Sequence, residues 1–245
     1  MTPEHYLDLL ASEATLLADT AAAIDLDAPV PTCPGWSARD AVEHTGMVYH
    51  HKIACMQLGR RPEDDEYATA PAPDQGSVEF FREALAALLE ELVRRGPSAP
   101  SYTWWPDDQT VGFWYRRMAQ ETAVHRVDVQ SVTGDVTHID DDLALDGVDE
   151  VLTLFLAGDW AEEPVDDASG STVAIRTGEN LWRATLDQEE VTLTSGPGPS
   201  HATVSGEPSE LLLWLWGRRP LSAVTVEGDD AVIAELRERL SLATQ

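Results

Sequence analysis

The sequence predicts an α+β protein in which an antiparallel helix bundle precedes a small α+β domain. Three observations indicate this division. Long amphipathic segments without strand patterns fill roughly the first 160 residues. Short strand-like runs separated by Gly, Pro and Asp turns follow. An acidic, loop-like stretch, Glu162–Gly170, lies between them. We therefore expect one domain over residues 1–162 and a second over residues 170–245.

Apolar residues at helical spacing indicate five helices in the first part of the chain. Thr2 and Pro3 suit the start of the first helix, as N-cap and first helical residue. Ser37 and Asp40 form a capping-box pattern before the second helix. The predicted helices span residues 3–24, 38–58, 77–95, 111–133 and 142–160.

The second part alternates short strand patterns with two helical ones, which is typical of a small mixed domain. The predicted strands span residues 172–176, 181–186, 190–194, 202–205 and 223–227. The predicted helices of this part span residues 211–216 and 230–240.

Composition limits the classes of partner. The chain of 245 residues carries a net charge of −28, which repels nucleic-acid backbones and anionic membranes. No run of about 20 apolar residues is present. The two cysteines, Cys33 and Cys55, imply no disulfide framework, and we expect a cytoplasmic protein. Lys52 is the single lysine, so arginine supplies nearly all the positive charge, as is common in GC-rich bacterial genomes.

One stretch combines residues that can bind a metal ion. Glu121 and His125 stand four residues apart in the predicted helix 111–133, and so lie on one face of it. Zinc accepts both carboxylate oxygen and imidazole nitrogen. His44, on the inward stripe of the second helix, is the best third donor. Asp128 would be a further ligand or a partner that orients an imidazole. The competing interpretations are a solvated helix face for the pair and a hydrogen-bonded core histidine for His44.

Two other histidines are weaker candidates for metal binding. His50 and His51 fall on faces rotated away from His44, and we expect them at the surface. His51 and Cys55 have the spacing of the first half of a zinc motif, but Leu58 stands where the next ligand would be.

Three motifs in this order resemble the mycothiol-dependent maleylpyruvate isomerase family, and the resemblance covers nearly the whole chain. They are CPGWSARDAVEHTG (33–46), FWYRRMAQETAVHRVD (113–128) and WLWGRRPLSAVTVEGDD (214–230). The resemblance implies a DinB-like antiparallel four-helix bundle that holds a divalent metal, usually Zn²⁺. It also implies that a small SCP2-like α+β domain, shaped like sterol carrier proteins, follows the bundle.

Carried over to this sequence, the family's metal ligands fall on His44, Glu121 and His125. Its C-terminal arginine, which handles substrate, falls on Arg218, with Arg219 beside it as the alternative. Mycothiol or a similar small thiol would be the cosubstrate.

The leading functional hypothesis is a metal-dependent enzyme that uses such a thiol. It would catalyse thiol addition or transfer to a small, acidic electrophile, or its thiol-assisted cis–trans isomerisation. A metal-dependent hydrolase on the same bundle is one alternative. A non-catalytic protein that binds an apolar ligand is the other. The electrophile, the native metal and the oligomeric state stay open.

Overall fold

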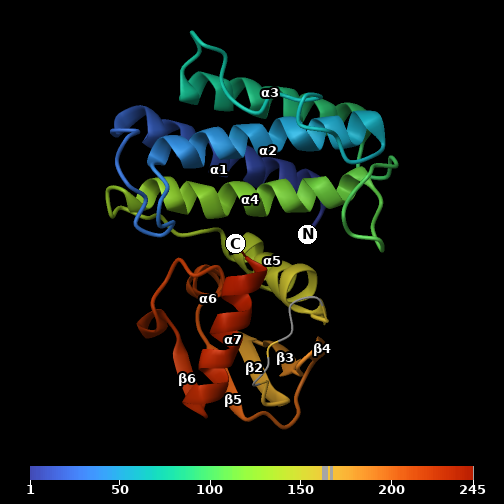
Figure 1. The fold of residues 1–245 in the computed structure, drawn as a ribbon, viewed down its shortest axis with the longest axis vertical. Helices are drawn as coiled ribbons and strands as arrows, with labels where there is room; N and C mark the ends of the chain where they lie inside the picture. Colours follow the sequence, from blue (N-terminus) through green and yellow to red (C-terminus); the bar gives the residue numbers. More distant parts are fainter. Residues whose placement is uncertain (162–164, 166–167, 245) are drawn as a thin grey trace. The chain divides into compact units, whose positions relative to one another are not determined.

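The computed structural model describes residues 1–161, 165 and 168–244, and the chain forms two compact units (Figure 1). The first unit is Met1–His138 and the second is Ile139–Gln245. The predicted fold class is confirmed: a four-helix bundle comes first, and a small α+β unit with a six-stranded mixed sheet follows. The acidic stretch expected to link them, Glu162–Gly170, lies largely outside the described residues.

The first unit is a bundle of long helices (Figure 1). The first two of them begin at the capping residues that the sequence predicts. The Thr2 hydroxyl accepts a hydrogen bond from the His5 N–H at 3.3 Å. Ser37 and Asp40 form the reciprocal capping box. The bundle helices are α1 (Pro3–Ala23), α2 (Ala38–Leu58), α3 (Ser77–Arg95) and α4 (Val111–Ser131).

Helix α4 is buried along nearly its whole length, so it brings charged and polar side chains into the core of the bundle. Charged groups are almost never fully buried unless they are paired. Arg126, fully buried, meets this condition by donating to Glu13 on α1 at 2.7 Å and to Gln130 at 2.9 Å. The same guanidinium also donates to Thr137 in the loop after α4. This network joins α4 to α1.

The second unit is built on a sheet with the strand order β1-β4-β3-β2-β5-β6. Only the β2–β5 pair is parallel among its described strand pairs. Helix α7 packs on β2 and β5, and α5 packs on α6. Its strands are β1 (Gly158–Asp159), β2 (Ser171–Thr177), β3 (Asn180–Leu186), β4 (Glu190–Ser195), β5 (Ala202–Ser205) and β6 (Thr225–Gly228). Its helical segments are α5 (Asp141–Glu150), the π-helical η1 (Val151–Leu156), α6 (Pro208–Leu215), the 3-10 turn η2 (Leu221–Ala223) and α7 (Asp230–Ala243).

The fifth predicted helix, over residues 142–160, differs from the structure in extent and in the unit to which it belongs. Helical structure ends at Leu156, and Gly158 takes a positive φ of 127° that stops it. Strand β1 then pairs with β4, and the Trp160 N–H donates to Glu189 at 2.7 Å. Helix α5 packs on α6 in the second unit. The observed division at 138/139 therefore differs from the expected domains 1–162 and 170–245.

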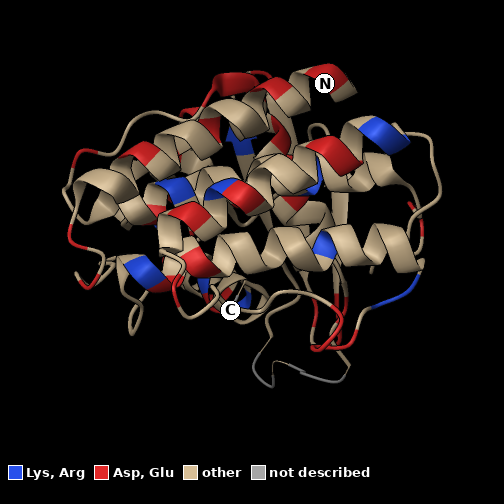
Figure 2. Ribbon diagram, turned by 90° about the horizontal axis from the view of Figure 1, so that it is seen from above, with Lys and Arg blue, Asp and Glu red and all other residues tan. Residues whose placement is uncertain are grey.

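The distribution of charged residues and the hydropathy of the helices agree with the composition. Acidic residues recur along the helices of the ribbon, where basic residues are fewer (Figure 2). Among the described helices, none combines the length and the apolar character that crossing a bilayer requires.

Candidate metal centre

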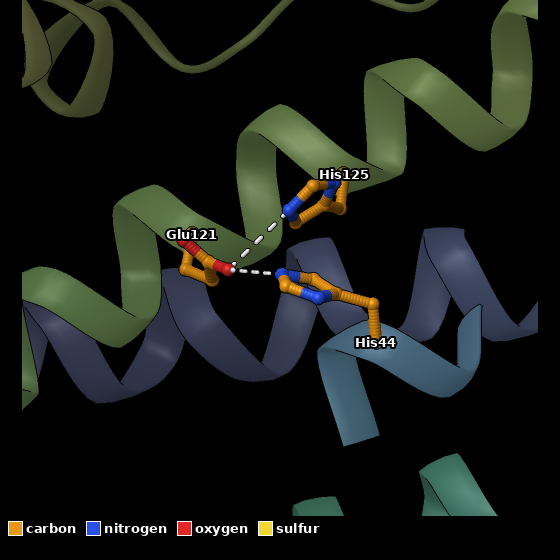
Figure 3. A group of neighbouring side chains, drawn as sticks. All are labelled: His44, Glu121 and His125. Carbon is orange, nitrogen blue, oxygen red and sulfur yellow. Dashed lines mark ion pairs between the residues drawn. The ribbon is translucent and has the colours of Figure 1, made fainter. Parts of the chain in front are cut away.

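Three side chains from two helices of the bundle converge on one point (Figure 3). Glu121 Oε1 lies 3.3 Å from His44 Nε2 and 3.3 Å from His125 Nε2. One ligand atom from each residue lies within 4.8 Å of the others. Glu121 and His125 share a face of α4 because they are four residues apart. His44 comes from α2, so the group exists only where the two helices pack together.

A buried hydrogen bond holds α2 and α4 in this alignment. Tyr49 on α2 and Thr122 on α4 have hydroxyl oxygens 2.5 Å apart in the core. Thr122 also donates to the Met118 carbonyl, so the oxygen that meets Tyr49 is itself fixed. The cluster lies on the same pair of helices, beside this contact, since Thr122 stands between Glu121 and His125 on α4.

The Glu121 carboxylate is kept ionised by its neighbours. Burial by itself raises the pKa of this carboxyl group, but the Arg117 guanidinium and the two imidazoles outweigh it and hold the pKa well below its usual value. Arg117, one helical turn earlier on α4, contacts Glu121 Oε2. Glu121 Oε1 remains directed at the two histidines. The carboxylate is therefore a negatively charged oxygen donor across the neutral pH range.

Asp128 fixes the far side of the His125 ring. Its Oδ2 lies 3.0 Å from His125 Nδ1, while Nε2 of the same ring faces Glu121. Thr32, in the loop before α2, donates to Asp128 Oδ1 at 2.8 Å. Burial lowers the pKa of His125, but the contacts with Asp128 and Glu121 outweigh burial and raise it to about 9. Of the two roles expected for Asp128, this arrangement is that of a partner that orients the imidazole.

An aromatic wall closes one side of the cluster. The Trp36 ring stacks on His125 at a centroid distance of 5.9 Å and an interplanar angle of 11°. It also meets the His44 ring at 5.0 Å with a tilt of 58°. Trp36 thereby restricts both imidazoles to their present orientations.

The donor set fits a divalent ion such as zinc. Zinc binds imidazole nitrogen and carboxylate oxygen at about 2.0–2.2 Å, and two donors at tetrahedral angles on such an ion are separated by about 3.3 Å. The two oxygen–nitrogen separations at Glu121 have this value. Two histidines and one glutamate also leave a fourth position of a tetrahedral ion free, as catalytic zinc sites do. His44 is the most exposed of the three, with 31% of its side chain accessible, so the cluster opens on its side.

The arginines predicted to handle substrate belong to the second unit. Arg219 pairs with Glu210 on α6 at 3.0 Å. Arg218 donates to the Trp216 carbonyl at 2.7 Å. Both side chains are half-buried after the end of α6.

His50 and His51 were expected at the surface, and both are half-buried instead. The His50 ring packs against Phe80 on α3 with centroids 5.3 Å apart. His51 Nδ1 lies 3.6 Å from Cys55 Sγ. Helix α2 is covered by α3 on one side and by the loop after it on another, so few of its faces remain exposed.

Sequence reasoning missed three residues around the cluster: Arg117, Trp36 and Thr32. Arg117 stands four residues before Glu121, a spacing that could have identified it as an ion-pair partner. Trp36 lies inside one of the quoted motifs but carried no chemical signal of its own. Thr32 is separated from Asp128 by 96 positions, and nothing local links the two.

Comparison with known proteins places this chain in a family. The family model described as "Mycothiol maleylpyruvate isomerase N-terminal domain" matches residues 8–130. The model described as "MDMPI C-terminal domain" matches residues 142–235. The chain is therefore a two-part protein with a bundle of this kind, and it belongs to the mycothiol maleylpyruvate isomerase family. No protein of curated function matches it at a significant level.

Solved structures agree on the fold. A crystal structure of the mycothiol-dependent maleylpyruvate isomerase is 14% identical to this chain, covers 93% of both chains and superposes with a TM-score of 0.60. A histidine-to-alanine mutant of that enzyme matches over the same share, with 13% identity and a TM-score of 0.60. A ubiquinone synthesis protein, UbiJ-SCP2, covers 42% of this chain with a TM-score of 0.30, a level from which we draw no structural conclusion.

Proposed function

We propose that this protein is a metal-dependent enzyme that uses mycothiol or a similar small thiol on a small acidic electrophile. The donor set of His44, Glu121 and His125 carries this proposal, because its spacing suits a divalent ion with one free position. Membership of the mycothiol maleylpyruvate isomerase family supports the choice of a thiol as cosubstrate.

In this proposal, one group of residues binds the metal ion and another binds the substrate. His44, Glu121 and His125 would be the ligands. Arg117 keeps Glu121 ionised, and Asp128 accepts from the Nδ1–H of His125, which leaves Nε2 free to ligate. A divalent ion such as Zn²⁺ bound there would supply a Lewis acid and would lower the pKa of a coordinated thiol.

The reaction needs no redox partner. The thiolate sulfur adds to the carbon of a conjugated C=C bond, and the electron pair of that bond moves to the neighbouring carbonyl as an enolate. The former double bond is now single and rotates. Expulsion of the thiolate restores the C=C bond in the other geometry, whereas protonation and release of the adduct complete a transfer. Arg218 would pair with a carboxylate of the substrate, as a guanidinium does in a bidentate ion pair.

Metal content and turnover test this proposal together. We expect about one divalent ion per wild-type chain, loss of most of it in His44→Ala, and full retention in the control His50→Ala, whose ring packs on Phe80. Arg218→Ala should keep its metal and raise the KM for an acidic substrate by roughly 10–100-fold, the loss expected for one charged hydrogen bond. A chain that takes up no metal when zinc is offered would refute the metal site, and thiol-independent turnover would instead support a hydrolase.

A further inference from the structure

The single lysine of the chain occupies an unusual environment in the bundle. Lys52, on α2, is half-buried, and its Nζ lies 3.1 Å from His51 Nδ1. The ammonium also stands over two indole rings, 5.5 Å from the centroid of Trp104 and 5.2 Å from that of Trp114. Within the described part of the chain, no carboxylate lies within 4.0 Å of Lys52. A partly buried cation thus has no anion in contact with it.

Charged groups of both signs act on Lys52. Burial lowers the pKa of Lys52, the charges of Glu121 and Cys55 oppose this, and those of Arg117 and Arg61 lower the pKa slightly further. The Glu121 carboxylate is already shared by Arg117 and the two histidines. An incoming anion at Lys52 would therefore meet an ammonium that no carboxylate of the described residues contacts.

The nearby acidic residue Asp64 does not pair with the Lys52 ammonium. Asp64 acts on His51 and raises its pKa slightly against burial, which is the main cause that lowers the pKa of His51 to about 4. The Asp64 carboxylate accepts a hydrogen bond from Tyr67 at 3.3 Å. His51 is therefore neutral at pH 7, and its Nδ1 can accept a hydrogen bond from the ammonium.

The position of Lys52 relates it to the candidate metal centre. Lys52 follows His44 by eight residues on α2, and Arg117 precedes His125 by eight residues on α4, which is about 12 Å of helix in each case. The His44–Glu121 and Lys52–Trp114 contacts both cross from α2 to α4. The ammonium and the metal ligands therefore lie along one helix pair, about two turns apart, within the bundle.

One wall of this place faces solvent. Trp104 is 40% exposed, while Trp114 beneath it is fully buried and donates its indole N–H to Ser101 at 2.9 Å. The Trp104 ring is held edge-on against Phe113, with centroids 4.8 Å apart. A flat, fixed aromatic surface beside an ammonium suits the unsaturated carbon chain of an acid, whose carboxylate would then meet the ammonium and not the negative ring face.

We propose that the Lys52 ammonium, beside the exposed ring of Trp104, is an anion subsite that takes a carboxylate of the acidic substrate. That the carboxylate belongs to the enzyme's substrate rests on the proposed function. That the subsite binds a carboxylate does not depend on it. We call this place the Lys52 subsite. It would set specificity for acids by holding one end of the molecule two helical turns from the metal ligands.

The single lysine makes the test direct. The intact protein is treated with an amine-acylating N-hydroxysuccinimide ester, and acylation of Lys52 is followed by peptide mass spectrometry. We expect succinate to slow this acylation several-fold, and succinamide or sodium chloride of matched ionic strength to leave it unchanged. Equal protection by succinamide, no protection by succinate, or complete resistance of Lys52 to the reagent without any anion would each overturn the subsite.

The same labelling in His44→Ala separates the Lys52 subsite from the metal centre. Protection by succinate should persist in this variant, because the readout needs neither metal nor turnover. Protection that disappears with His44 would mean that succinate binds at the metal ligands, and the subsite would be refuted while the proposed function stood.

Binding of succinate measured by calorimetry completes the test. Lys52→Met should weaken it roughly 10-fold or more, and Lys52→Arg should retain most of it, because a charged hydrogen bond is lost in the first variant and kept in the second. Arg60→Met is the matched control, since it removes a cation that pairs with Glu66 at 2.6 Å. If Lys52→Met and Arg60→Met weaken succinate binding equally, the net charge of the protein explains the effect, and the proposal is overturned.

Discussion

Replacing Asp128 by Asn should weaken metal binding without unfolding the bundle. The Asp128 side chain is fully buried and contacts His125 Nδ1 at 3.0 Å and Thr32 at 2.8 Å. Asn has nearly the same shape and retains one oxygen, so packing survives. What is lost is the negative charge that fixes the His125 tautomer and increases the basicity of its Nε2.

The size of this effect follows from the contacts. A hydrogen bond to a charged group contributes about 1.5–3 kcal/mol, and removal of such a partner behind a metal-bound histidine typically lowers affinity by about 10–100-fold. The two estimates agree, since a tenfold change equals about 1.4 kcal/mol. We therefore expect the zinc dissociation constant of Asp128→Asn to rise by about one to two orders of magnitude.

Competition with a chromophoric chelator measures this dissociation constant directly. Asp19→Asn is the matched control, because Asp19 is an exposed α1 residue with only a 3.4 Å contact to Arg82. Circular dichroism of both variants establishes that the helices remain. A wild-type zinc affinity in a folded Asp128→Asn protein would refute the orienting role of Asp128.

Two further predictions concern the bundle itself. The pKa of His125, about 9 in the metal-free fold, exceeds its unfolded value of about 6.5, so its stabilising contribution is complete below pH 6.5 and is lost as pH rises through 9. Urea unfolding of the metal-free protein should show a loss of up to about 3 kcal/mol over this range; a flat profile would contradict the pairing of His125 with Asp128 and Glu121. Glu13→Ala leaves the buried guanidinium of Arg126 without its carboxylate and should cost about 3 kcal/mol or more in the same assay. A loss below about 1 kcal/mol would mean that Gln130 and Thr137 satisfy Arg126 by themselves.

The helices of the bundle were predictable because their signals are local. The capping box at Ser37 and Asp40 and the Thr2–Pro3 start each lie within one turn, and the structure uses both. Periodic apolar residues placed α1 to α4 within a few residues of their observed bounds. The fifth helix was overextended because its apolar run continues past the point where Gly158 turns the chain into strand β1.

The proximity of Glu121 and His125 was equally predictable from local spacing, since residues four positions apart on a helix share a face. His44 was a hypothesis of another kind. Its stripe on α2 indicated that it points inward, but only the packing of α2 on α4 brings its Nε2 within 3.3 Å of Glu121. The choice between Asp128 as a ligand and Asp128 as an orienting partner likewise depended on rotamers that spacing does not specify.

By itself, the sequence determined the α+β class, the helix starts, the family motifs and the pairing of Glu121 with His125 in the candidate metal site. The tertiary structure alone decided the division at His138, the Arg117 and Trp36 contacts, and the setting of Lys52 among His51 and two indole rings. The physical reason is the distance along the chain over which each interaction acts. Periodicity and capping act within a few residues, whereas burial, charge compensation and donor geometry depend on which helix faces which, and that is settled only when the whole core packs.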